Sequence, residues 1–117
     1  MQSLEEFYAS VGSNAGEIVG RLGGSESMVR RFLSKFPSDN SINELKTALD
    51  AGDTDTAFRC AHTMKGLCAT LGIQSVFEKA SNVTELLRAK NIEDAKTAFP
   101  ALRQEYEKAL ESLKSLG

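Results

Sequence analysis

Residues 53–72 read DTDTAFRCAHTMKGLCATLG and contain the only histidine of the chain, His62. We expect a helix over 54–71, because polar and apolar residues in this stretch separate onto two faces at about 100° per residue. His62 projects away from the apolar face on this helical wheel. The apolar stripe that we expect to face the core consists of Cys60, Met64, Leu67 and Leu71.

The surroundings of His62 on that wheel favour a chemical role over a packed core position. Gly66 lies one turn along, although a glycine inside a helix costs about 1 kcal/mol relative to alanine. The missing side chain would open space beside the imidazole; close helix–helix packing is the alternative reason for a glycine, but Gly66 is on the histidine side. An exposed histidine without a role is the other interpretation. The residues within roughly 60° of His62 are Phe58, Arg59, Lys65, Gly66 and Ala69.

An imidazole that is partly neutral near pH 7 is a competent nucleophile, and Lys65 could offset the charge of a phosphoryl group placed on it. The sequence has no glycine-rich nucleotide loop and no carboxylate cluster suited to Mg²⁺. Cys68 is about 120° from His62 on the same helix, so a Cys–His pair is not expected. A hydrolase or metal enzyme built on the single histidine therefore lacks partner groups.

The rest of the chain is predicted to be helical. Ser3–Glu6, Ser41–Glu44 and Ser75–Glu78 each have the form of a capping box, and no segment shows the strict alternation of a strand. Pro100 is expected to kink the last helix or to mark where its straight part begins. The predicted helical segments are 3–11, 14–22, 26–36, 42–51, 54–71, 74–90 and 92–116.

The composition indicates one folded domain over 1–117, with 41% hydrophobic and 26% charged residues. A net charge of −2 gives no strong basic field for nucleic acid, and no apolar run reaches the ~18 residues of a membrane span. The N-terminus does not look like a signal peptide. Cys60 and Cys68 would be about 12 Å apart along one helix, too far for a disulfide, and we expect reduced thiols in a cytosolic protein.

The run from Ala61 to Gly72, AHTMKGLCATLG, resembles the histidine-containing phosphotransfer (HPt) domain family, whose motif is approximately A-H-x-L-K-G-S/A-x-x-x-L/I-G. The resemblance implies an all-α fold: an antiparallel up-and-down four-helix bundle over 26–116, with short N-terminal capping helices over 1–25. It also implies that His62 accepts a phosphoryl group, that Lys65 stabilises it and that Gly66 gives a partner access.

The resemblance places further residues near this site. Arg88 falls where some members carry a basic residue, and Arg59 shares the face of His62. Many members carry Gln or Glu at the position of Thr84, where it helps to orient the histidine, so a threonine there leaves the orienting group open. Leu67 replaces a small residue of the motif. The expected docking surface for a partner includes Phe58, Ala69 and Phe77.

As a member of that family, the chain would carry a phosphoryl group on His62 between receiver-domain aspartates of a two-component phosphorelay. The expected partners are response-regulator receiver domains, including the receiver of a hybrid sensor kinase, and not nucleic acid or membrane. The chain would be a monomeric phosphocarrier rather than an enzyme. It would need no cofactor or metal of its own, because Mg²⁺ would belong to the receiver. The alternative is a non-phosphorylated helical adaptor that binds a receiver or another signalling partner.

Overall fold

The computed structural model describes residues 2–117 and is helical throughout, with one isolated bridge between Gln2 and Leu116 and no strand in this range. The all-α prediction is confirmed. A short 3₁₀ turn, η1, covers Phe36–Ser38. The helices are α1 (Leu4–Ser10), α2 (Ala15–Arg21), α3 (Glu26–Leu33), α4 (Ser41–Ala51), α5 (Thr54–Leu71), α6 (Gln74–Arg88) and α7 (Ile92–Lys114).

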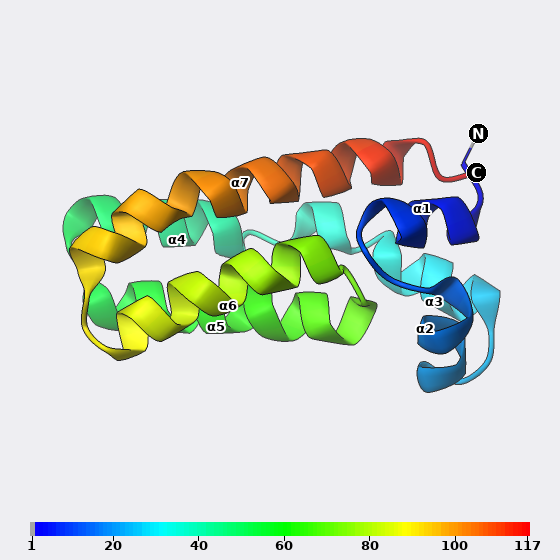
Figure 1. The fold of residues 1–117 in the computed structure, drawn as a ribbon, viewed down its shortest axis with the longest axis horizontal. Coiled ribbons are helices and arrows are strands. Elements are labelled where there is room, and N and C mark those ends of the chain that lie inside the picture. Colours follow the sequence, from blue (N-terminus) through cyan, green and yellow to red (C-terminus); the bar gives the residue numbers. More distant parts are fainter. Residues whose placement is uncertain (1) are drawn as a thin grey trace.

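Helices α4 to α7 lie along the long axis of the molecule and run alternately in opposite directions (Figure 1). Each packs against its neighbours in the chain, and α7 also packs against α4. The turns between them are short, which favours antiparallel neighbours. Gly52 and Gly72 end α4 and α5 with φ of 72° and 74°, a left-handed conformation that side chains rarely adopt.

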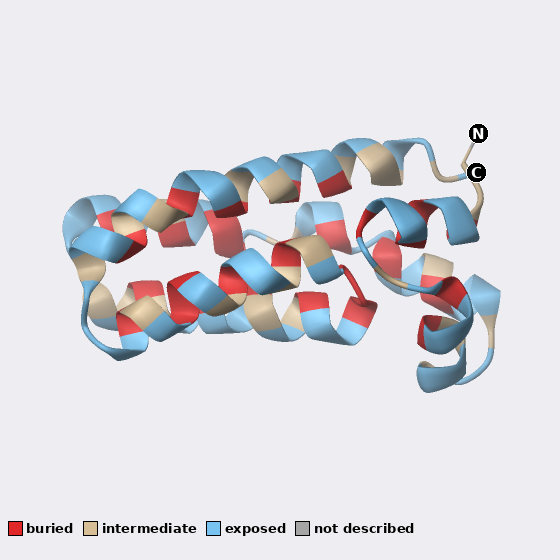
Figure 2. Cartoon of the chain, in the orientation of Figure 1, coloured by how far each residue is buried: buried red, intermediate tan, exposed pale blue. Residues whose placement is uncertain are grey.

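The buried residues line the inner sides of the four long helices and continue into the N-terminal helices (Figure 2). Three of the four residues in the apolar stripe expected on α5 are buried, Cys60, Met64 and Leu71, whereas Leu67 is only half-buried. Cys60 and Cys68 are both buried and both free thiols. The buried residues of α5 are Ala57, Cys60, Ala61, Met64, Cys68 and Leu71.

Helices α1, α2 and α3 form a cap at one end of the bundle (Figure 1). Helix α3 contacts both α2 and α5, and the four long helices of the bundle begin at Ser41. The cap covers the end of α5, where the last carbonyl groups of a helix have no partner within the helix. Tyr8 donates its hydroxyl to the carbonyl of Leu71 at 2.7 Å.

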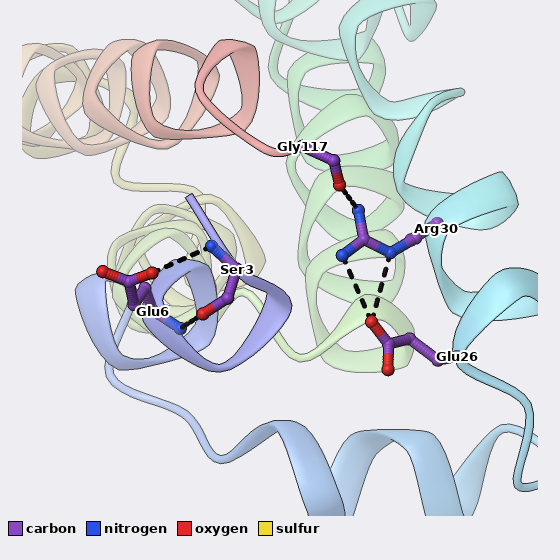
Figure 3. A network of polar contacts seen from close by, with 5 residues as sticks. All are labelled: Ser3, Glu6, Glu26, Arg30 and Gly117. Carbon is purple, nitrogen blue, oxygen red and sulfur yellow. Dashed lines mark hydrogen bonds and ion pairs between the residues drawn. The ribbon is translucent and has the colours of Figure 1, made fainter. Parts of the chain in front are cut away.

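The first predicted capping box is confirmed, and it lies close to the point where the two ends of the chain meet (Figure 3). The Ser3 hydroxyl accepts the N–H of Glu6, and the Glu6 carboxylate accepts the N–H of Ser3. Beside it, Arg30 of α3 bonds the carbonyl of Gly117 and pairs with Glu26 at 3.2 Å. The C-terminus is thus tied to the cap.

The other two predicted capping boxes are wrong. Helix α4 begins at Ser41 itself, with Asn40 at the cap position, and the Ser41 N–H donates to Asp39 instead. Helix α6 begins one residue before Ser75, after Ile73, whose side chain is fully buried and cannot cap. Each serine therefore lies inside the first turn, Ser41 as the first residue of α4 and Ser75 as the second residue of α6.

Candidate functional site

His62 stands on the exposed face of α5, as the wheel predicts, and its nearest described ring neighbour is Phe58 one turn earlier. The two ring centroids are 5.8 Å apart and the ring planes differ by 29°, which is a stacked arrangement. A side chain in a helix leans toward the N-terminal turn, which explains why the imidazole meets position 58. Both ring nitrogens, Nδ1 and Nε2, remain available for chemistry, since no hydrogen bond to this ring is found in residues 2–117.

The space beside His62 is open because Gly66 has no side chain. A Cβ built on Gly66 would meet no atom within 4 Å, so close packing against another helix does not explain this glycine. Its helical backbone would accept any residue, and glycine is a costly choice in a helix interior. The open space therefore lies on the solvent side, where a second protein could approach the imidazole.

Lys65 supplies a positive charge on the same side of α5. Its side chain is half-buried, and within residues 2–117 no carboxylate forms an ion pair with it. A lysine three residues after the histidine lies on the neighbouring ridge of the helix. Its ammonium group is thus available to an anion bound at His62.

A second cation comes from α6. The Arg88 guanidinium lies 5.0 Å from the centre of the Phe58 ring, a cation–π contact, and its Nε pairs with Glu85 at 2.9 Å. Arg88, Phe58 and His62 therefore form a continuous row across the two helices. Phe58, Arg88 and Arg59 line a depression of about 360 Å³. Arg59 also donates to the Thr56 hydroxyl at 3.2 Å.

Thr84 does not fit the orienting role that its position suggests. It is fully buried, and its hydroxyl donates to the carbonyl of Ala80 in its own helix at 2.7 Å. On the same helix, the buried Ser81 hydroxyl has no hydrogen-bond partner. Sequence reasoning missed Ser81, because an ordinary serine in a polar stretch gives no signal.

The docking residues expected from the sequence occupy two separate places. Phe58 borders the imidazole, whereas Ala69 and Phe77 line a recess of about 310 Å³ where α2, α5 and α6 meet. Arg21 of α2 reaches into this region and donates to the carbonyl of Ala69 at 2.9 Å. Arg21 could not be identified from the sequence, because this contact joins residues 48 positions apart.

The two thiols of α5 are poor candidates for nucleophiles. Burial raises the pKa of Cys68 to about 12, and burial followed by the nearby Glu44 carboxylate raises the pKa of Cys60. Both therefore remain protonated near neutral pH. Among residues 2–117, no group of three or more His, Cys, Asp or Glu side chains is placed to hold a metal ion.

None of the described helices combines the length and the apolar character that a membrane span requires.

The comparisons with known proteins agree with the resemblance seen in the motif. A family model described as the Hpt domain matches residues 27–112, which contain His62, helices α4 to α6 and all but the last two residues of α7. Helices α1 and α2 lie outside the matched range. Neither the comparison with curated proteins nor the one with solved structures returns a match for the chain.

Proposed function

The chain belongs to the Hpt domain family, and from that premise we propose that His62 is the residue that accepts and donates the phosphoryl group. Hpt domains are phosphocarriers of two-component signalling that work with receiver domains, and they are not enzymes themselves. The observation that carries the proposal is the exposed imidazole with open space over Gly66 and an unpaired lysine beside it.

The proposed step moves a phosphoryl group from a receiver aspartate to His62. The lone pair of one imidazole nitrogen, the more exposed Nε2 in our proposal, attacks phosphorus in line with the acyl phosphate bond. A nitrogen–phosphorus bond forms while the bond from phosphorus to the aspartate oxygen breaks, and aspartate leaves as a carboxylate. The proton on the other imidazole nitrogen passes to solvent. Transfer to a second receiver reverses these changes.

This chain contributes position and charge to that step. Stacking on Phe58 holds the imidazole on the surface of a rigid helix, and the half-buried Lys65 places a cation where negative charge accumulates. Arg88 adds a second cation across the Phe58 ring. In this proposal the receiver supplies the Mg²⁺ and the carboxylates that bind it. The transfer takes place in the cytoplasm, and the receivers include those of hybrid sensor kinases.

A second candidate function is a helical adaptor that binds a receiver without accepting phosphate. The position of Thr84 favours it, because its hydroxyl bonds its own helix and no other described group hydrogen-bonds the imidazole. The adaptor and the carrier share a docking surface and differ only in whether a phosphorus–nitrogen bond forms.

The experiment is to mix the protein with a panel of radiolabelled, phosphorylated receiver domains and to follow the label. The carrier predicts transfer from at least one receiver, in a form that acid releases and alkali preserves. The adaptor predicts a stable complex with a receiver and no transfer of label. A chain that neither takes label nor binds any receiver contradicts both proposals.

A further inference from the structure

The recess between the cap and the bundle has the features of a small docking pocket. Its volume is about 310 Å³, and it lies where α2 meets the end of α5 and the start of α6. Ile18, Ala69 and Phe77 give it an apolar lining, while Glu17, Arg21 and Gln74 bring polar groups. Five of its ten lining residues are polar or charged, so the recess suits a partner surface that carries apolar and polar groups side by side.

Ala69, which lines the recess, lies on the same side of α5 as His62. Ala69 follows His62 by seven residues, close to two full turns, so the two side chains leave α5 in nearly the same direction. They are separated by about 10 Å along the helix axis. A partner of standard size covers about 800 Å² of this surface, a disc of about 16 Å radius. Such a partner centred on His62 extends over Ala69 and the recess.

We propose that the recess is a second contact site for the receiver domain that docks on His62, and that it takes an apolar side chain of the receiver next to an acidic one. This inference rests on the proposed phosphocarrier function. The apolar side chain would lie against Ala69 and Phe77, and the acidic group would pair with Arg21. Arg21 uses one guanidinium nitrogen for the carbonyl of Ala69, and a guanidinium has five N–H donors in all.

The same site would select among receivers. Glu17 precedes Arg21 by one turn of α2. An acidic partner group that is out of reach of Arg21 would lie near the Glu17 carboxylate and be repelled by it. Glu17 and Arg21 both lie outside the segment 27–112 that matches the family model. The site therefore joins residues inside the segment that the family model matches to residues outside it.

The alternative role for Arg21 is purely structural. Its bond to Ala69 satisfies one of the carbonyl groups left open at the end of α5, and this would stabilise the helix without any partner. The two roles differ in what they change. A structural role affects the midpoint of thermal unfolding, whereas a docking role affects the receiver concentration at half-maximal transfer.

The test uses the full chain, loaded on His62 with the small donor phosphoramidate, and the receiver that exchanges label fastest with it. Transfer rates are measured against receiver concentration for Arg21→Glu and for Ala69→Phe, which fills the recess from an exposed position. The matched control is Lys96→Glu on α7, which makes the same change in net charge and lines a different recess, between α4 and α7. Thermal unfolding of each variant is followed by circular dichroism.

We expect both recess variants to raise the half-saturating receiver concentration at least fivefold, with a limiting rate within twofold of wild type and no change for Lys96→Glu. The effect of Arg21→Glu should shrink at 0.5 M NaCl, where the Debye length is about 4 Å, and that of Ala69→Phe should not. An unchanged half-saturating concentration in Ala69→Phe, or in a folded Arg21→Glu, overturns the inference while leaving the carrier function intact. Failure of the wild type to exchange label with any receiver refutes the carrier function itself.

Discussion

The imidazole of His62 stacks on the ring of Phe58, with the centroids 5.8 Å apart, and the guanidinium of Arg88 lies 5.0 Å from the same Phe58 ring. One aromatic side chain thus joins the proposed nucleophile to a cation on the neighbouring helix. The arrangement holds the imidazole by packing, without using the nitrogen atoms that the chemistry needs. The Arg88 guanidinium contacts both the Phe58 ring and the Glu85 carboxylate.

Removing the Arg88 charge should weaken the phosphorylated form of the protein. In Arg88→Ala, we expect the phosphoryl exchange equilibrium with a receiver to shift away from His62 by about 1.4- to fivefold, since exposed charge pairs contribute about 0.2–1 kcal/mol. Glu85→Gln should shift it the other way, because Arg88 then loses its competing partner. The measurement is the ratio of phosphorylated protein to phosphorylated receiver at equilibrium.

Lys114→Ala, at the end of α7, is the control for that experiment because it also removes one exposed, paired cation. It should leave the ratio unchanged. Equal shifts in Arg88→Ala and Lys114→Ala would show that only the overall charge matters and that Arg88 has no specific place at the site.

Replacing Gly66 should make the protein more stable and less active. Gly66→Ala meets no atom in the chain and restricts the unfolded state, so we expect the free energy of unfolding to rise by about 0.4–1 kcal/mol. Gly66→Gln should slow transfer from receivers at least tenfold by filling the approach to the imidazole. Urea unfolding and transfer rates measure the two effects.

Gly20→Ala on α2 is the matched control, because its Cβ also meets nothing within 4 Å. It should give the same gain in stability with no change in transfer. If Gly66→Gln transfers as fast as the wild type, the open space beside His62 has no role in access.

The cap should contribute stability that disappears at high pH. Burial raises the pKa of Tyr8 to about 12 from its usual value near 10, so the unfolded chain loses this proton first. The contribution is fully present below pH 10 and is lost as the pH rises toward 12. Tyr8→Phe should flatten this part of the stability profile, measured by urea unfolding from pH 8 to 12.

Tyr8→Phe should also lower stability at pH 7, because the Leu71 carbonyl loses a buried hydrogen bond, which costs about 1–3 kcal/mol. A variant as stable as the wild type at pH 7, with the same alkaline profile, would mean that this contact does not fasten the cap to α5.

The sequence predicted the histidine helix from 54 to 71 with the bounds that the structure has, because polar and apolar faces, an N-terminal aspartate and a final glycine all agree there. The exposure of His62 and the open space at Gly66 followed from the same wheel. These are local properties of one amphipathic helix, and local pattern is sufficient to determine them.

The features that the sequence did not reveal depend on contacts between distant segments. Thr84 was expected beside the imidazole, but packing of α6 turns it into the core. The bond from Tyr8 to Leu71 spans 63 positions and that from Arg21 to Ala69 spans 48. The pattern of residues within a single helix cannot reveal such pairs. The recess between the cap and the bundle could therefore be identified only from the structure.

The most direct measurement of the central claim is to locate the phosphoryl group after transfer from a labelled receiver. We predict a phosphorus NMR signal in the phosphohistidine range, a phosphorylated peptide that contains residue 62, and loss of the signal in acid. His62→Gln, with a helical circular dichroism spectrum equal to that of the wild type, should take up no label. Label on another residue, or undiminished labelling of the folded His62→Gln protein, would contradict the account.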